Sequence, residues 1–344
     1  MSEKSTVPAL VTAEQRQSFT VYLEGRELPA SVCGKLLGEA ASKLDLPVVG
    51  DNVAVSLHDN GEKAVIHGVL PRTSLLLRKE AATGKDAQPL AANIAKIFIV
   101  MGLDESYNIA RLERLLVAAW DSGAAPVVVL TKKDLCPEPA LREKISAVER
   151  AAPGVEVVCL SSVSGEGVES VAKLLGGGIR CCFIGSSGAG KSTLINRLSG
   201  YEAAQTGPVR TSDGRGRHTT TSRHLYFLPC GGQIIDTPGI REFCLEYAQT
   251  GLDASFTEIE ELAKECRFQD CSHNSEPGCA VVAAVGKGTL PAVRLTSYQK
   301  LKKEMLHHEI KTDLIKRIQA KRKSMAFSRL CRDGSVKKRK LRGG

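Results

Sequence analysis

The 344-residue sequence contains no long hydrophobic run and few aromatic residues. No segment approaches the roughly 18 consecutive apolar residues of a membrane-spanning helix, so we expect no association with a membrane. Residues 1–18 are polar and carry both signs of charge, without the apolar segment and cleavage site of a signal peptide. We therefore predict a cytoplasmic protein that begins with a short disordered tail.

The sequence contains eleven cysteines, but their placement does not resemble a disulfide framework. Most of those outside one dense cluster stand singly in apolar, strand-like runs, as do Cys159, Cys181, Cys182 and Cys230. This pattern is typical of reduced, buried thiols in a cytosolic protein.

Positive charge is concentrated at the C-terminal end. The net charge of the chain is +9, and the segment from Lys300 onward holds sixteen Lys and Arg against four Asp and Glu. That segment alone carries +12, so the preceding residues carry about −3. A basic tail of this density favours a polyanionic partner, most often nucleic acid. The alternative is a solvated charged helix followed by a soluble tail.

The length allows two or three domains, each with its own core. Short alternating strands between residues 19 and 78 indicate a small β-barrel such as an OB-fold. Residues 19–88 contain only two aromatic residues, Phe19 and Tyr22, so base stacking there would be minor. From Leu90 onward strands and helices alternate, which predicts a parallel α/β sheet. The predicted organisation is a tail (1–18), a barrel with a linker (19–88), an α/β domain (89–245) and a helical, cysteine-bearing domain with a basic tail (246–344).

A phosphate-binding loop is predicted after the apolar strand at residues 179–184. The pattern Gly-x4-Gly-Lys-Ser runs directly into a helix with apolar periodicity, which is the context that a P-loop requires. Its backbone N–H groups and the helix N-terminus would bind phosphate oxygens. Lys191 would reach the β- and γ-phosphates, and the Ser192 hydroxyl would bind Mg²⁺. The nucleotide-binding residues predicted here are Gly185, Ser186, Ser187, Gly188, Ala189, Gly190, Lys191, Ser192 and Thr193.

Two later elements complete the predicted phosphate site. Asp236 ends another apolar strand and would hold Mg²⁺, and the Gly239 N–H would meet the γ-phosphate. The polar stretch 214–221 suits a switch loop in which one threonine closes on Mg²⁺. We favour Thr220 for this role, although spacing does not separate it from Thr219.

The predicted base-recognition motif is Thr131, Lys132, Lys133 and Asp134, which follows an apolar strand. The Asp134 carboxylate can accept two hydrogen bonds from guanine that adenine cannot supply, so the motif selects GTP over ATP. The Lys132 stem would pack along the base. Thr131 stands where asparagine is usual, which is expected to weaken one polar contact. Ser161 and Ser162 would form the backbone loop at the guanine carbonyl.

Ile240 follows Asp-Thr-Pro-Gly, where many GTPases carry a glutamine that orients water. Isoleucine cannot do this, so hydrolysis needs another group or a partner. His218 is the candidate, because an imidazole can position or deprotonate water near neutral pH. The alternative for His218 is a surface histidine in a flexible loop. The predicted catalytic set is His218, Lys191 and Thr220.

A metal site is predicted near the C-terminal end. Cys266, Cys271, His273 and Cys279 place three thiolates and one imidazole within fourteen residues. This donor set suits tetrahedral Zn²⁺, and without a fifth ligand or open position we predict one structural zinc ion. The segment has few large apolar residues, so metal binding is expected to supply much of its folding energy.

The order of these motifs resembles one family. In ordinary GTPases the base motif comes last, whereas here it precedes the P-loop, Asp236–Gly239 and the cysteine cluster. This order resembles the circularly permuted, small-subunit-dependent GTPases of bacteria, the RsgA (YjeQ/YloQ) family. Further matches, in a resemblance covering about residues 19 to 319, are Pro47–Asp51, Val69–Arg72, Arg111–Arg114, Gly216–Thr221, Asp236–Phe243 and Ser297–Tyr298.

The resemblance implies an N-terminal OB-fold barrel, a circularly permuted P-loop GTPase core and a C-terminal helical zinc-binding domain. It also implies a monomer that binds the small ribosomal subunit and its rRNA late in maturation. GTP hydrolysis to GDP would be stimulated by that subunit. The alternative is a non-catalytic, GTP-sensing rRNA-binding factor, which Ile240 keeps open. An ATPase is a weaker rival that Asp134 opposes.

Overall fold

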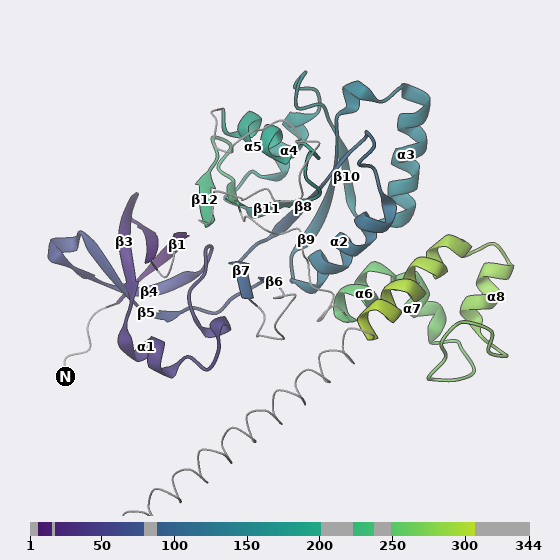
Figure 1. Ribbon diagram of the computed structural model, residues 1–344, viewed down its shortest axis with the longest axis horizontal. Helices are drawn as coiled ribbons and strands as arrows, with labels where there is room; N and C mark the ends of the chain where they lie inside the picture. Colours follow the sequence, from purple (N-terminus) through teal and green to yellow (C-terminus); the bar gives the residue numbers. More distant parts are fainter. Residues whose placement is uncertain (1–5, 16–17, 79–87, 201–222, 237–248, 307–344) are drawn as a thin grey trace, which may run out of the picture.

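The computed structural model describes residues 6–15, 18–78, 88–200, 223–236 and 249–306. A barrel and a C-terminal helical domain lie on either side of a central α/β domain (Figure 1). This is the architecture predicted from the sequence. None of the helices in the described ranges is long and apolar enough to cross a membrane.

Five strands form the closed N-terminal barrel: β1 (Val7–Gln15), β2 (Ser18–Leu23), β3 (Arg26–Val32), β4 (Asn52–His58) and β5 (Lys63–Val69). Neighbours are antiparallel except β3 and β5, and the pairing of β1 with β4 closes the barrel. The short helix α1 (Gly34–Glu39) follows β3. Alternating side chains point inward and are fully buried, among them Val11, Val21, Val53, Val55 and Ile66. This arrangement confirms the predicted barrel.

The prediction of a disordered tail over residues 1–18 is wrong for residues 7–15, which form β1. Val11 is completely buried, and Val7 to Leu10 pair with Val55 to Asn52 of β4. Polar residues around this short apolar segment hide its alternation in the sequence. Its partner strand lies about forty residues away in the chain, so only closure of the barrel makes it a strand.

The central sheet has five parallel strands in the order β10-β9-β8-β11-β13, with β12 antiparallel at its edge. Their bounds are β8 (Lys96–Gly102), β9 (Ala125–Thr131), β10 (Glu156–Cys159), β11 (Arg180–Ile184), β12 (Arg223–Phe227) and β13 (Gln233–Asp236). Helices α2 (Ile109–Asp121) and α3 (Glu138–Ala151) cover one face, whereas α4 (Val168–Leu174) and α5 (Lys191–Ser199) cover the other (Figure 1). Two apolar cores therefore enclose the sheet, as its hydrophobic strands predict.

The central sheet continues into the barrel. Strand β1 pairs with β12, where Glu14 lies opposite Arg223, and the two side chains form a 2.7 Å ion pair. Strand β12 also pairs with β13, so the strand hairpin that ends at Asp236 is hydrogen-bonded to the barrel. A second hairpin, β6 (Leu75–Arg78) and β7 (Gln88–Ala92), lies between the two domains.

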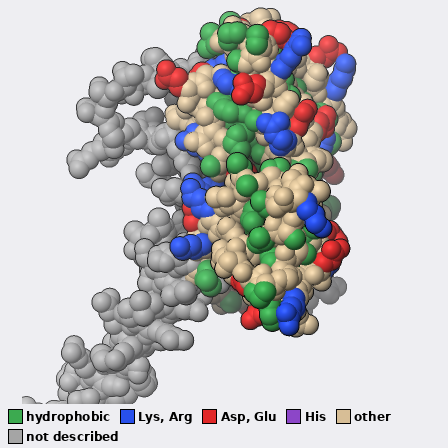
Figure 2. Space-filling model, turned by 90° about the vertical axis from the view of Figure 1, so that its right-hand side faces the viewer, with side chains coloured by type: hydrophobic (Ala, Val, Ile, Leu, Met, Phe, Trp, Pro, Cys, Tyr) green, Lys and Arg blue, Asp and Glu red, His purple; other side chains and the backbone are tan. Residues whose placement is uncertain are grey.

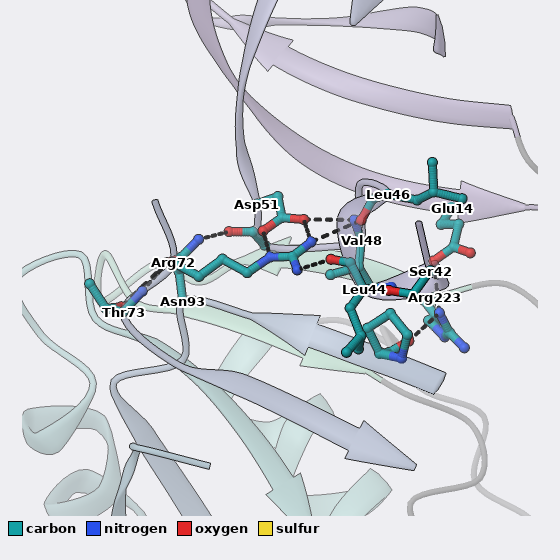
Figure 3. Close-up of polar contacts among 12 residues, drawn as sticks. Glu14, Ser42, Leu44, Leu46, Val48, Asp51, Arg72, Thr73, Asn93 and Arg223 are labelled. Atoms are coloured by element: carbon teal, nitrogen blue, oxygen red, sulfur yellow. Dashed lines mark hydrogen bonds and ion pairs between the residues drawn. The ribbon is translucent and has the colours of Figure 1, made fainter. Parts of the chain in front are cut away.

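Arg72 holds the base of the barrel (Figure 3). Its guanidinium donates to both Asp51 carboxylate oxygens at 2.8 and 2.7 Å, and to the carbonyl oxygens of Leu44 and Leu46. The Asp51 side chain is fully buried. Next to it, the Gly50 carbonyl accepts from Asn93 and Arg180 of the central domain. Two of the short motifs quoted for the family resemblance, Pro47–Asp51 and Val69–Arg72, thus form this joint.

In the described residues, the C-terminal domain contains α6 (Gln249–Ser255), α7 (Thr257–Ala263), α8 (Ala280–Gly286) and a helix over residues 292–306. Leu252, Phe256, Ile259 and Tyr298 form its core, which also includes Val117 of α2. Arg294 is 5% exposed and reaches across the boundary to Glu113 of α2 at 3.4 Å and to the Ala151 carbonyl of α3. The domain is therefore anchored to the central domain by both apolar and charged contacts.

Candidate nucleotide site and metal centre

The predicted P-loop joins β11 to α5 and requires glycine at its ends. Gly185 has φ +146°, and a Cβ there would lie 2.1 Å from the Val100 carbonyl oxygen. Gly190 has φ +91° and is the N-cap of α5, which begins at Lys191. The loop therefore ends at a helix N-terminus, where backbone N–H groups are available to an anion.

The Lys191 side chain folds back over this loop. Its Nζ donates to the carbonyl oxygens of Gly185 and Ser186 at 2.9 and 2.7 Å. The ammonium group is therefore held beside the N-terminus of α5. Two sources of positive charge converge at the same place, which suits the binding of a phosphate chain.

The base motif at the end of β9 is bonded directly to the P-loop. Thr131 is 1% exposed, and its hydroxyl donates to the Ala189 carbonyl at 2.6 Å. Threonine in place of the usual asparagine therefore still makes a polar contact, and it ties two motifs that are 58 residues apart. Lys132 follows in the left-handed conformation, with φ 61°. This turn allows the Lys133 N–H to bond the Leu160 carbonyl at 3.2 Å.

Asp134 is oriented by the loop after β10. Its Oδ1 accepts a 2.5 Å hydrogen bond from the Ser161 hydroxyl. The Ser162 hydroxyl is buried and has no hydrogen-bond partner among the described residues. Sequence reasoning predicted a backbone role for both serines and did not foresee that Ser161 would orient the Asp134 carboxylate. The feature of the sequence that could have indicated this contact is the position of Ser161, directly after the strand that follows the base motif.

One further group at this site was not predicted from the sequence. Asp104, in the loop between β8 and α2, forms an ion pair with Lys132, whose Nζ lies 2.5 Å from Asp104 Oδ2. Nothing in its local sequence marks it, because its partner is 28 residues away. The parallel order of β8 and β9 places the two side chains at the same end of the sheet.

Part of the predicted phosphate site lies outside the described residues, namely His218, Thr219, Thr220, Gly239 and Ile240. Asp236 is the last residue of β13, which pairs in parallel with β11. Both strands therefore end at the edge of the sheet where the P-loop begins. Their order brings the Asp236 backbone to the predicted nucleotide site, as expected for a parallel sheet.

The cysteine cluster converges as predicted. One ligand atom from each of Cys266, Cys271, His273 and Cys279 lies within 4.8 Å of all the others. The Sγ atoms of Cys266 and Cys279 are 3.8 Å apart, and His273 Nδ1 lies 3.7 and 3.5 Å from them. Bonds of about 2.3 Å to sulfur and 2.0–2.1 Å to nitrogen in a tetrahedron require separations of about 3.8 and 3.5 Å. The donor set and spacing could therefore hold a metal ion.

The surroundings of the cluster favour the ligand forms of His273 and Cys266. Burial, together with the positive charge of Lys302, lowers the pKa of His273, which keeps the imidazole neutral. Burial alone would raise the pKa of Cys266, but backbone N–H donors of Val281 and Ala280 help to bring it below its usual value. For Cys271, the backbone N–H of His273 lowers the pKa, but burial and the neighbouring thiols Cys279 and Cys266 outweigh it and raise the pKa to about 11. A neutral imidazole and thiolates are the forms that bind metal. All cysteines in the described part of the chain are free thiols.

Comparisons with known proteins agree on one family. A family model described as RsgA GTPase matches residues 69–246. The "Small ribosomal subunit biogenesis GTPase RsgA 2" of Lactiplantibacillus plantarum is 46% identical over 303 residues, which cover 88% of this chain and 84% of that protein. The "Small ribosomal subunit biogenesis GTPase RsgA" of Streptomyces coelicolor is 47% identical over 265 residues, covering 77% of this chain and 72% of that protein.

Two crystal structures share the fold. YjeQ from Thermotoga maritima has a TM-score of 0.67 at 26% identity, and the match covers 88% of this chain and 99% of that one. YloQ, titled a circularly permuted GTPase, has a TM-score of 0.64 at 21% identity and supports the fold alone, over 88% of this chain and 96% of its own.

Proposed function

The chain belongs to the RsgA GTPase family, and from that premise we propose that it binds the small ribosomal subunit late in maturation and hydrolyses GTP there. Relatives that are 46% and 47% identical over most of this chain are named small ribosomal subunit biogenesis GTPases. The observation that carries the proposal is the bond between Thr131 and Ala189, which joins a guanine motif to a P-loop. This bond supports the proposal because the predicted guanine motif and the predicted P-loop lie together despite their reversed order in the chain.

The proposed chemistry assigns a role to each part of the site. Asp134, oriented by Ser161, accepts hydrogen bonds from guanine, and Lys191 with the P-loop N–H groups binds the phosphates. Ser192, Thr220 and Asp236 would hold Mg²⁺, which neutralises charge on the β- and γ-phosphates when bound. His218 would orient the attacking water, because the residue after Asp-Thr-Pro-Gly is Ile240.

The joint between the barrel and the central domain offers a route for stimulation by a partner. Strand β12 follows the proposed switch stretch 214–221 in the chain, and β13 ends at Asp236. Strands β12 and β13 form a hairpin, and β12 pairs with β1 of the barrel. A displacement of the barrel would therefore act on the hairpin that connects the proposed switch stretch to Asp236. Contact of rRNA with the barrel could in this way alter hydrolysis.

Basic residues supply the proposed contacts with rRNA. On the face formed by the central and C-terminal domains, Lys and Arg are interspersed with Asp and Glu (Figure 2). Of the sixteen basic residues from Lys300 onward, only Lys300, Lys302 and Lys303 are among the described residues. We therefore assign most of the phosphate binding to residues 307–344 and propose a cytoplasmic monomer.

The metal that we propose for the cysteine cluster is zinc in a structural role. Cys279 is the N-cap of α8, and Cys266 follows α7, so an ion there would join two short helices. No carboxylate belongs to the cluster in the described chain, which disfavours a catalytic role.

The test of the proposed function is GTP hydrolysis with and without purified small subunits, measured at several salt concentrations. We expect strong stimulation at low salt and a steep loss of association as salt rises. His218→Ala should lower stimulated turnover while nucleotide affinity stays nearly unchanged. Turnover equal to that of the wild type would remove His218 from the mechanism.

A second candidate is a GTP-sensing rRNA-binding factor with negligible turnover. Ile240 is the observation that favours it, because the usual water-orienting glutamine is missing. Saturating binding to small subunits without any stimulation of hydrolysis would support this candidate over a GTPase.

A further inference from the structure

Asp104 makes an ion pair with the lysine of the base motif. Lys132 Nζ lies 2.5 Å from Asp104 Oδ2, and the two side chains are 27% and 28% exposed. The pair lies between the end of β8 and the end of β9, and Asp104 is outside the sequence motifs that predict the nucleotide site. It is partly shielded from water, so it is stronger than a pair on an open surface.

The Asp104 carboxylate is itself held in place. Its other oxygen, Oδ1, accepts from the Ser106 backbone N–H at 3.0 Å and from the Ser106 hydroxyl at 2.6 Å. Partial burial would raise the pKa of Asp104, but hydrogen bonds from Lys132 and Ser106 lower it to about 2. The group is therefore a carboxylate at neutral pH.

The loop that carries Asp104 is fixed to its neighbours. The Leu103 N–H bonds the Thr131 carbonyl at 3.0 Å, and Lys144 Nζ of α3 donates to the Leu103 carbonyl at 2.6 Å. Gly102 leaves no room for a side chain, because a Cβ would lie 2.7 Å from Asp104 Oδ1. Such close packing leaves little freedom for the carboxylate to move.

We propose that Asp104 is a positioning residue for guanine nucleotides, acting through Lys132. By holding Nζ, it keeps the aliphatic stem of Lys132 beside the place where Asp134 receives the base. A lysine side chain loses rotamer entropy when a ligand immobilises it, so fixing it beforehand improves affinity. This inference rests on the proposed function, because it assumes that the motif from Thr131 to Asp134 binds guanine.

The experiment compares GDP and GTP affinities of the wild type, Asp104→Asn, Lys132→Ala and the double variant, each with an intact melting transition. Asp104→Asn should raise the Kd for both nucleotides roughly tenfold. The turnover at saturating GTP should stay unchanged, because the base contacts are the same before and during hydrolysis. The double variant should bind no more weakly than Lys132→Ala, since Asp104 acts only through that lysine.

The matched control is Glu105→Gln, which removes one negative charge from the next residue of the same loop. Glu105 is exposed and is not a partner of Lys132, so its variant should bind GDP as the wild type does. Asp104→Ala serves as the second variant if Asp104→Asn does not fold.

The outcomes separate this inference from the function on which it rests. A wild type that binds no guanine nucleotide would overturn the proposed function. A wild type that binds GDP, with an Asp104→Asn affinity within about twofold of it, would overturn only the role of Asp104. Additive losses in the double variant would show that Asp104 does not act through Lys132 and would also overturn it.

Discussion

The Thr131 hydroxyl donates a 2.6 Å hydrogen bond to the carbonyl oxygen of Ala189, and both residues are almost completely buried. Thr131 is at the end of β9, whereas Ala189 belongs to the loop between β11 and α5. The bond therefore spans strand β8, which lies between β9 and β11 in the sheet. It fixes the base motif relative to the phosphate loop.

Removing this hydroxyl should weaken nucleotide binding. Thr131→Val keeps the shape of the side chain but leaves the Ala189 carbonyl without its partner, which costs about 1–3 kcal/mol. We expect a roughly fivefold or larger rise in the Kd for GDP, measured with a fluorescent nucleotide. Thr131→Ser retains the hydroxyl and is the control. Equal affinities of the valine and serine variants would contradict the proposed link.

Arg72 should be essential for the stability of the barrel. Arg72→Ala leaves the Asp51 carboxylate fully buried and unpaired, which is expected to cost about 3–5 kcal/mol of unfolding free energy. Urea denaturation followed by circular dichroism measures this. The control is Lys63→Ala, which breaks the exposed pair with Asp59 and should have no measurable effect. Similar midpoints for the two variants would rule out a structural role for the buried pair.

Arg294 should hold the C-terminal domain to the central domain. Its guanidinium contacts Glu113 and Glu258 at 3.4 and 2.5 Å and lies 3.9 Å from the Phe256 ring centre. Arg294→Ala would leave the buried Glu113 carboxylate unpaired, so we expect a loss of about 3–5 kcal/mol of unfolding free energy. Limited proteolysis should then cut between the two domains faster than in the wild type. The exposed Arg142, paired with Glu138, offers a matched control.

Asp121 should make stability depend on pH. Burial raises the pKa of Asp121 to about 6, partly offset by a hydrogen bond from the Gly251 N–H of α6. An unfolded aspartate has a pKa of about 3.9, so between these values the folded state holds a proton that the unfolded state has lost. The proton held by Asp121 in the folded state therefore contributes to stability at about pH 4, and this contribution is lost as the pH rises through about 6.

Asp121→Asn mimics the protonated form and keeps an oxygen acceptor for Gly251. Its melting temperature should exceed that of the wild type at pH 7.5, and the difference should shrink toward pH 5. Glu149→Gln, at an exposed position on α3, is the control for the change in charge. If the difference in melting temperature between Asp121→Asn and the wild type does not vary with pH, it does not arise from ionisation of a buried Asp121 carboxylate.

Metal removal should unfold the C-terminal domain selectively. We expect the purified chain to contain one zinc ion, and Cys271→Ser or His273→Ala to lose it, because closed tetrahedral sites need all four ligands. Metal analysis and near-ultraviolet circular dichroism measure the two effects. Cys230→Ser, outside the cluster, should retain the metal. A folded, zinc-free Cys271→Ser variant would argue against a structural metal.

Local patterns were sufficient to predict much of this protein. The predicted P-loop, the motif from Thr131 to Asp134 and the cysteine cluster each lie within a short segment, so each could be proposed without a structure. The alternation of strands and helices in the α/β domain was also predicted, because long buried runs and amphipathic helices have clear periodicity, whereas the edge strand β12 and helix α4 were not. Strand β1 was missed, since its pairing partner β4 is distant in the chain.

The amino-acid sequence alone was enough to predict the residues of the proposed chemistry: a phosphate loop, a guanine motif, a set of metal ligands and the motif order that indicates permutation. The groups that hold these parts in place became visible only in the folded structure. Asp104 meets Lys132, Thr131 meets Ala189 and β1 joins β12 because the order of the strands brings distant segments of the chain together. Such contacts depend on the packing of strands rather than on neighbouring residues, so no local pattern records them.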